Sequence, residues 1–180
     1  MITHRDNLGG WLNELGLIGT GVEVGAACGD YARKILEQWK GKCLYLIDPW
    51  ERQDAAIYRE RTNHEAPFTE WHQRCKELRD QDPRVISVQA LSLDASSVFP
   101  DQSLSFVYLD GNHSYDAVLD DLQAWWLKLK PDGLFGGHDF LNKLDEGWHC
   151  EVRSAVTHWA EAHDLRPTLT DCSSWWIRRP

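Results

Sequence analysis

The sequence has no C-x-x-C pair, and its five cysteines are scattered along the chain. Such a pattern indicates neither a disulfide framework nor a zinc cluster. No apolar run is long enough to cross a bilayer, and the first residues lack the apolar core of a signal peptide. We therefore expect a cytoplasmic protein that has no membrane partner.

Basic residues are also in deficit. Nineteen Lys and Arg stand against 28 Asp and Glu, which gives a net charge of −9. Because binding to phosphate groups needs a basic surface, this balance argues against nucleic acid as a partner. The first glycine-rich turn has G-x-x-x-G spacing, without the G-x-G-x-x-G fingerprint or a P-loop lysine. The missing fingerprint counts against a nicotinamide-dependent oxidoreductase, one of the alternatives.

What the chain does contain is an alternation of apolar runs and amphipathic segments. Short buried strands are predicted at residues 20–25, 42–48, 84–90, 104–110 and, less strongly because of its glycines, 133–139. Helices are predicted at residues 7–15, 30–39, 115–129 and 151–163, with a broken helical stretch at 52–79. Strands that alternate with helices imply a parallel sheet covered on both faces.

The end of the chain has a different pattern. Two strand-like runs, LRPTLTD and SSWWIRRP, are joined by Asp171, Cys172 and Ser173 alone. So short a join permits only an antiparallel pair, since a parallel crossover needs a dozen or more residues. No repeat or linker divides the chain. We expect a single α/β domain over residues 1–180, with an N-terminal helical segment at 1–19, an open Rossmann-like sheet and a C-terminal antiparallel hairpin.

Ligands of open α/β sheets bind at the carboxyl ends of the strands, so the residues that follow each strand are candidates for a site. The first predicted strand ends in EVGAACGDY, where Gly25 and Gly29 allow a sharp turn and the close approach of a ligand. The second ends in Asp48, an acid suited to ribose hydroxyls. A structural role stays open at each place, in the turn itself or as a cap before Pro49. Together they favour a ribose-bearing ligand.

The residues that follow the later strands include more side chains that can bind a metal or accept a proton. The third is followed by Ser92, which borders the site or caps a helix. The fourth and fifth end in VYLDGNHSYD and GGHDF. If these two strands are neighbours, their ends lie about 5 Å apart, and Asp110, His113, His138 and Asp139 converge. Such a group can hold a divalent cation or supply a general base, although Asp110 can also cap a helix and His113 can be merely solvated.

The stretches EVGAACGDY, LIDPW and VYLDGNHSYDAVLDDLQAWWLKLKPDGLFGGHDF resemble class I S-adenosylmethionine-dependent methyltransferases. More narrowly, they resemble the small-molecule O-methyltransferase branch that includes the macrocin O-methyltransferase type and relatives of cephalosporin hydroxylase. The likeness spans about residues 21–178. It implies a seven-stranded, mostly parallel sheet whose last strand is antiparallel. It also implies an enzyme that moves a methyl group from S-adenosyl-L-methionine to a hydroxyl of a small molecule, of sugar or phenolic type.

The resemblance also assigns roles to residues. The methionine part of the cofactor is expected against residues 23–30, its ribose at Asp48 and its adenine near Ser92. The cofactor-binding residues so implied are Glu23, Gly25, Gly29, Asp30, Asp48, Ser92 and Asp110. In metal-dependent members, acids at the ends of the fourth and fifth strands bind magnesium. The corresponding metal ligands here are Asp110, His138 and Asp139.

Two residues depart from the pattern of the family. His138 is a poor ligand for magnesium, which prefers oxygen, so the metal can be magnesium, manganese or another transition ion, or be absent. Asn112 stands where related sequences often carry an aspartate, a candidate base. The expected catalytic residues are therefore His113, which takes the proton, and Asp110; a metal-activated hydroxyl is the other option.

Several questions stay open at the level of sequence. Pro67 breaks the helical stretch at 52–79, as in a lid or substrate loop or between two plain amphipathic helices. A nucleoside-binding protein without catalysis and a metal-dependent hydrolase are alternatives to the methyltransferase. The sequence leaves the acceptor undefined, and it leaves the oligomeric state open between monomer and homo-oligomer.

Overall fold

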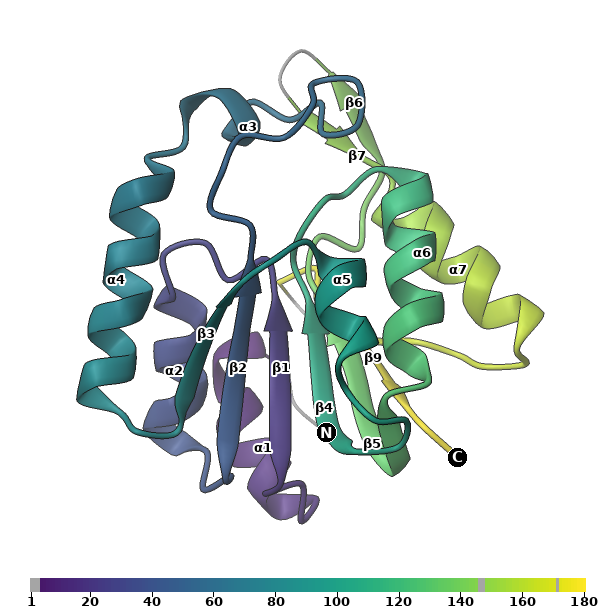
Figure 1. Ribbon diagram of the computed structural model, residues 1–180. Coiled ribbons are helices and arrows are strands. Elements are labelled where there is room, and N and C mark those ends of the chain that lie inside the picture. The colour runs from purple at the N-terminus through teal and green to yellow at the C-terminus, as the bar shows by residue number, and fades with distance from the viewer. Residues whose placement is uncertain (1–3, 146–147, 171) are drawn as a thin grey trace.

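A seven-stranded sheet forms the centre of the computed structural model, which describes residues 4–145, 148–170 and 172–180 (Figure 1). The strand order is β3-β2-β1-β4-β5-β9-β8. The strands are β1 (Thr20–Val24), β2 (Cys43–Asp48), β3 (Val85–Gln89), β4 (Leu104–Leu109), β5 (Leu129–Gly137), β8 (Thr168–Leu169) and β9 (Trp175–Arg178). Strands β1 to β5 pair in parallel, whereas β9 is antiparallel to both β5 and β8. This confirms the open, mostly parallel sheet and the antiparallel C-terminal pair; Asp171 of the expected join lies outside the described residues.

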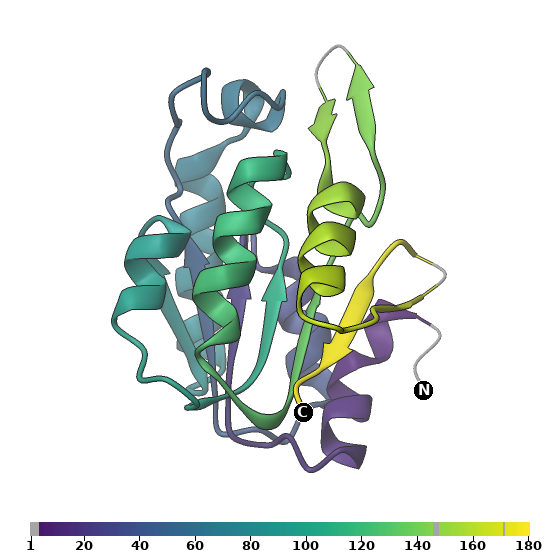
Figure 2. The same ribbon diagram turned by 90° about the vertical axis from the view of Figure 1, so that its right-hand side faces the viewer.

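Helices cover both faces of the sheet (Figures 1 and 2). One face packs against α1 (Leu8–Glu14), α2 (Asp30–Gln38) and α4 (Phe68–Gln81). The other packs against α5 (Ser92–Ser97), α6 (Tyr115–Trp126) and α7 (Val152–Ala162). Two apolar clusters result, one on each side of the sheet, which explains why the strands read as continuous apolar runs.

The central strands show how this burial works. In β4 every residue is buried. Phe106 and Tyr108 belong to one apolar cluster, while Val107 and Leu109 belong to the other. This is the period of two that a strand imposes on its side chains.

The end of α2 is held by a side chain from another element. Arg84, just before β3, donates to carbonyl groups at the end of the helix, which have no partner within the helix.

Two predicted helical segments need correction, and one pair of strands was not predicted. The helix predicted at 115–129 ends at Trp126, because Leu129 already pairs with Leu104 as the first residue of β5. The broken stretch at 52–79 consists of α3 (Thr62–Glu65) and α4, with Pro67 as the N-cap of α4. A second sheet, β6 (Lys143–Asp145) with β7 (Trp148–Cys150), was not predicted; it stands above the carboxyl ends of the strands (Figure 2).

The first described residues add a short 3₁₀ helix, η1 (Arg5–Asn7), before α1. It lies against α2, so the described part of the predicted N-terminal helical segment packs on the fold; residues 1–3 of that segment lie outside the described residues. Among the helices that the structure describes, none is long and apolar enough to span a bilayer.

Candidate active site

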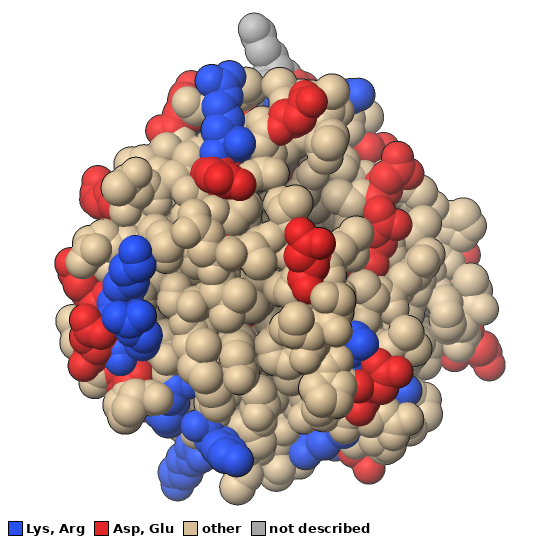
Figure 3. All heavy atoms as spheres, in the orientation of Figure 1, with Lys and Arg blue, Asp and Glu red and all other residues tan. Residues whose placement is uncertain are grey.

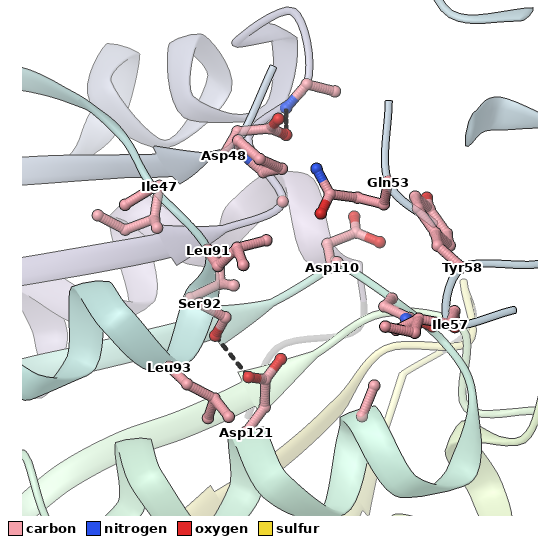
Figure 4. Close-up of a pocket in the computed structure, with 18 of the residues that line it drawn as sticks. Ile47, Asp48, Gln53, Ile57, Tyr58, Leu91, Ser92, Leu93, Asp110 and Asp121 are labelled. Atoms are coloured by element: carbon pink, nitrogen blue, oxygen red, sulfur yellow. Dashed lines mark hydrogen bonds between the residues drawn. The ribbon is translucent and has the colours of Figure 1, made fainter. Parts of the chain in front are cut away.

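A cavity of about 490 Å³ lies at the carboxyl ends of the parallel strands (Figure 4). The strand order reverses at β1 and β4, and this is the position where open α/β sheets bind ligands. Five of the residues predicted from the sequence line the cavity: Gly25, Asp48, Ser92, Asp110 and His113. The other predicted residues lie outside its lining: Glu23, Gly29, Asp30, His138 and Asp139.

The turn after β1 depends on its glycines. Gly25 and Gly29 have φ angles of 80° and 78°, in the left-handed region that favours glycine. A Cβ atom on Gly25 would overlap the backbone carbonyl group of Asp110, so the turn and the end of β4 are in direct contact. Asp30 follows on α2, where its exposed carboxylate pairs with Arg74 at 2.6 Å. The cofactor roles of Gly29 and Asp30 therefore stay predictions that no contact with the cavity supports.

Asp48 ties the turn after β1 to the end of β2. Its Oδ2 accepts a hydrogen bond from the Ala27 amide at 3.0 Å, and its Oδ1 accepts one from the Trp50 amide at 2.7 Å. Burial raises the pKa of Asp48, although these two hydrogen bonds lower it. Since each carboxylate oxygen has two lone pairs, the carboxylate can hold both turns and still accept from ribose hydroxyls.

Glu23 lies beneath the cavity floor, on β1. Its side chain is buried, and among the described residues its Oε2 has no hydrogen-bond partner. Burial and the nearby charge of Asp110 raise its pKa well above the usual range. A buried carboxylate oxygen without a partner needs an explanation, and the amino group of a bound cofactor is a donor that would satisfy it.

The four residues at the ends of β4 and β5 converge as expected. His113 Nε2 lies 3.5 Å from Asp110 Oδ1 and 3.7 Å from Asp139 Oδ2. His138 Nδ1 lies 3.8 Å from Asp110 Oδ1 and 3.2 Å from Asp139 Oδ1. Burial raises the pKa of Asp139, but its hydrogen bond with His138 and the charges of the two histidines outweigh this and lower it. The two histidines beside Asp139 thus favour its ionised form.

The cluster also includes two charged residues that the sequence analysis did not indicate. Glu60 is buried, and its Oε1 accepts from the Nδ1 of His113 at 2.9 Å. Arg5 donates to Asp110 Oδ2 at 3.3 Å and to the Tyr108 hydroxyl at 3.0 Å. Both come from segments distant in sequence, and neither stands in a motif, so the sequence carries no local signal for them.

The surroundings of His113 decide its charge. Burial lowers its pKa, but the hydrogen bonds and charges of Asp110 and Glu60 outweigh burial and raise the pKa well above the usual range. The ring is therefore an imidazolium held among carboxylates. It becomes able to accept a proton once another positive charge reaches the same carboxylates and reduces their hold on its own proton.

The cluster also fits a divalent metal. One ligand atom from each of Asp110, His113 and Asp139 lies within 4.8 Å of the other two. Among the described residues, the buried Nε2 of His113 has no hydrogen-bond partner, and it could serve as a ligand once the ring is neutral. One nitrogen and two oxygens suit a transition ion better than magnesium. This group contains His113 where the sequence predicted His138 beside Asp110 and Asp139, so the metal role of His138 stays a prediction.

The segment between β2 and α4 closes one side of the cavity. Gln53, Ile57, Tyr58 and Glu60 from this segment line it, and Figure 4 shows the first three beside Asp110. The segment is tied to the end of β4, because Asn112 donates to the Ile57 carbonyl at 3.1 Å. This contact favours a lid or substrate loop over a plain pair of helices for the segment. Asn112 stands where related sequences often carry an aspartate, and here its side chain holds the segment.

The opposite end of the cavity, at the carboxyl end of β3, contains Ser92 and Asp121. The Ser92 hydroxyl lies 2.5 Å from Asp121 Oδ1, and the Trp125 indole donates to Ser92 Oγ at 2.8 Å. Asp121 is buried, and the burial raises its pKa to about 7. The sequence pointed to Ser92 but gave no sign of this partner on α6.

Residues 22–140 match the family model described as "Methyltransferase domain". The comparison with curated proteins finds no match. Among solved structures, the O-methyltransferase NovP is similar with a TM-score of 0.72 at 15% identity, over 97% of this chain and 77% of that one. A S-adenosylmethionine-dependent methyltransferase from Aquifex aeolicus has a TM-score of 0.59 at 15% identity, over 98% and 93% of the two chains.

A third similar structure is the 1,6-didemethyltoxoflavin-N1-methyltransferase from Burkholderia thailandensis, with its substrate and S-adenosylhomocysteine bound. Its TM-score is 0.60 at 16% identity, over 97% of this chain and 76% of that one. At these identities the solved structures show a shared fold. The family model covers most of the sheet, including the carboxyl ends of β1 to β5. The chain therefore belongs to the methyltransferase-domain family, and it shares its fold with S-adenosylmethionine-dependent methyltransferases among the solved structures.

Proposed function

We propose that this protein transfers a methyl group to a hydroxyl group of a small molecule. The observation that carries the proposal is the convergence of Asp110, His113 and Asp139, whose ligand atoms lie within 4.8 Å of one another. Two of these residues, Asp110 and His113, line the cavity. A hydroxyl acceptor must lose its proton during methylation, and this cluster places a proton acceptor where the cavity meets the end of β4.

The cofactor is expected across the ends of β1, β2 and β3. Asp48, which lines the cavity, is expected to accept from the ribose hydroxyls. The buried Glu23, which lies outside the lining, is expected to face the amino group. S-adenosylmethionine, when bound, supplies an electrophilic methyl group on a sulfonium centre. The contribution of the protein is to hold the acceptor oxygen in line behind that methyl carbon, since alignment supplies much of the rate of such a displacement.

His113 takes the proton from the acceptor. Glu60 holds Nδ1 of the ring at 2.9 Å, so Nε2 faces Asp110 and Asp139 and is the atom that receives the proton. Because its raised pKa favours the imidazolium, His113 becomes a base only after nearby positive charge has driven its own proton from Nε2 into solvent. The sulfonium centre of the cofactor supplies such a charge, and it does so in the reactive complex alone.

A divalent metal, magnesium or manganese, is compatible with the same residues. Asp110 and Asp139 would hold it together with His138 or His113, and when bound it would lower the pKa of the acceptor hydroxyl. Nε2 of His113 cannot serve as a ligand and as a base at once. A metal held through His138 leaves His113 as the base, as the resemblance implied.

The lining favours an acceptor with a flat or amphipathic ring. Tyr58, Phe68 and Trp71 line the cavity on the side of the lid segment. Aromatic side chains with a polar tip suit sugar or phenolic hydroxyl compounds. A nucleic-acid acceptor is not favoured, because on the face in Figure 3 the Lys and Arg side chains lie in small groups beside acidic ones.

Calorimetric titration and a turnover assay test the proposal together. Wild type, Asp110→Asn and Asp139→Asn are titrated with S-adenosylmethionine and S-adenosylhomocysteine, with and without magnesium or manganese. They are then assayed on a panel of phenols and sugars. We expect both variants to bind the cofactor and to lose turnover, while Asp116→Asn, an exposed site on α6, behaves as wild type. Normal turnover in both variants would show that the site is misassigned, and wild type that binds neither ligand would overturn the proposal.

A further inference from the structure

Asp121 is a buried carboxylate at the β3 end of the cavity, and the proton transfer described above does not use it. It projects from α6 and lines the cavity together with Ser92. Its side chain is 7% exposed in relative terms, and its Oδ1 lies 2.5 Å from the Ser92 hydroxyl. Figure 4 shows the other oxygen turned away from Ser92, into the space that the labelled residues surround.

When Asp121 is ionised, the hydrogen bonds around Ser92 have one polarity. The indole N–H of Trp125 is a donor with no acceptor capacity, and it donates to Ser92 Oγ at 2.8 Å. The hydroxyl proton of Ser92 is then free to donate to Asp121 Oδ1. The Ser92 hydroxyl is therefore engaged within the protein, and Asp121 Oδ2 is a buried polar atom that this end of the cavity offers to a ligand, whereas the lining residues Asp94 and Asp120 are exposed.

The surroundings of this oxygen are apolar. Ile47, Ala90, Leu91 and Leu93 line the same end of the cavity. Leu91 is 48% exposed and Leu93 is 46% exposed, high values for leucines beside a buried carboxylate. Apolar side chains on the faces and a buried acceptor at the edge form a slot for a flat ring that carries an N–H donor at its rim.

We propose that Asp121 is the residue that selects adenine in the cofactor, by accepting a hydrogen bond from the exocyclic amino group at Oδ2. The inference rests on the proposed function, because it needs the cofactor in this cavity with its base at the end of β3. It adds a residue that the sequence did not indicate, on a helix rather than on a strand end. Ser92 acts as the positioning residue, since its hydroxyl fixes which way the carboxylate faces.

The test compares two ligands that differ at the amino group and at the adjacent ring nitrogen N1. S-adenosylhomocysteine and its inosine counterpart, in which a carbonyl oxygen replaces the amino group and N1 carries a hydrogen, are titrated calorimetrically into wild type and Asp121→Asn. A hydrogen bond to a charged group predicts that wild type prefers the adenosine ligand by roughly 10- to 100-fold. Asp116→Asn, on the exposed side of the same helix, is the matched control and keeps this ratio.

The fixed polarity of Ser92 makes the expected result in Asp121→Asn specific. Ser92 still donates to the amide oxygen, so the NH₂ group of the asparagine faces the ligand. That group repels the amino group of adenine and matches the carbonyl of the inosine ligand. The preference should therefore invert in Asp121→Asn. In the double variant Ser92→Ala/Asp121→Asn the amide can turn over, and the ratio should approach one.

Three outcomes decide the matter. An inverted preference in Asp121→Asn and a ratio near one in the double variant support the proposal. A wild-type ratio in Asp121→Asn overturns it while leaving the methyltransferase proposal intact. Wild type that binds neither ligand overturns the proposed function and this inference with it. Thermal unfolding of each variant is recorded alongside, and an inverted ratio in a folded variant cannot come from loss of structure.

Discussion

Gly25→Ala tests the contact between the turn after β1 and the end of β4. Gly25 has a φ of 80°, and a left-handed conformation costs a residue with a Cβ about 1–2 kcal/mol. The added Cβ would also overlap the backbone carbonyl of Asp110, which cannot turn aside as a flexible side chain can. Overpacking of this kind costs about 1–3 kcal/mol. We therefore expect the free energy of unfolding to fall by about 2–5 kcal/mol.

Two other glycines serve as matched controls. Gly16 has a φ of 69° but open space around the position of its Cβ, so Gly16→Ala should lose only the conformational part, about 1–2 kcal/mol. At Gly111 the nearest atom to an added Cβ is Val24 Cγ1 at 3.7 Å, an ordinary contact. Gly111→Ala should therefore be close to neutral, or stabilising by about 0.4–1 kcal/mol through the unfolded chain.

Urea unfolding followed by circular dichroism measures all three variants. The order of destabilisation should be Gly25→Ala, then Gly16→Ala, then Gly111→Ala, with equal m values. Titration with S-adenosylhomocysteine should show weaker binding in Gly25→Ala than in Gly16→Ala, because the displaced Asp110 backbone borders the cavity, whereas Gly16 lies outside its lining. If Gly25→Ala loses no more stability than Gly16→Ala, the contact with Asp110 is not rigid and the reasoning fails.

Three further changes test other parts of the structure. The folded pKa of Asp121 is about 7, against about 4 in an unfolded chain, so the folded state binds more protons in this window. Wild type should lose up to about 4 kcal/mol of stability as the pH rises from 4 to 7, whereas Asp121→Asn should show a flatter curve in urea unfolding. Glu60→Gln removes a charge that raises the pKa of His113, so the acid limb of the pH–rate profile should move to lower pH, with cofactor affinity unchanged. Arg84→Ala removes two hydrogen bonds to the end of α2 and should lower the free energy of unfolding by about 1–3 kcal/mol.

Each of these has its own contrary result. An equally steep fall in the stability of Asp121→Asn between pH 4 and 7 would place the titration elsewhere. An unmoved acid limb in Glu60→Gln would mean that His113 is not the group that titrates in the reaction. Arg84→Lys, which keeps the charge but loses the forked geometry, should recover only part of the loss; full recovery would show that charge alone matters.

The sheet was largely predictable from the sequence, because buried parallel strands are short runs of apolar residues. The ends of β1, β2 and β4 fall within about two residues of the predicted bounds. The first half of β5 was missed, since Lys130, Pro131 and Asp132 look like the end of a helix and a turn. The β6–β7 pair was missed because its strands are only three residues long, which leaves no periodic pattern to detect.

The site was predictable in part, and for a physical reason. Residues that follow parallel strands meet at one edge of a sheet, so the convergence of Asp110, His113, His138 and Asp139 followed from strand order alone. Arg5 and Glu60 reach the same place from segments whose path depends on tertiary packing, which no local pattern records. The pairing of Ser92 with Asp121 depends on how α6 is rotated about its axis, and it too needed the structure.

The reversal of strand order has a further consequence, for the kinetics of folding. β1 pairs with β2, its neighbour in sequence, and also with β4, which lies in the second half of the chain. The β1–β4 pairing closes a long loop, so its entropy cost is higher than that of β1–β2 and it should form later. The cavity spans this junction, with Asp48 on one side and Asp110 on the other. A bound ligand therefore joins the first and second halves of the chain, and it should slow hydrogen exchange most at the amides between β1 and β4.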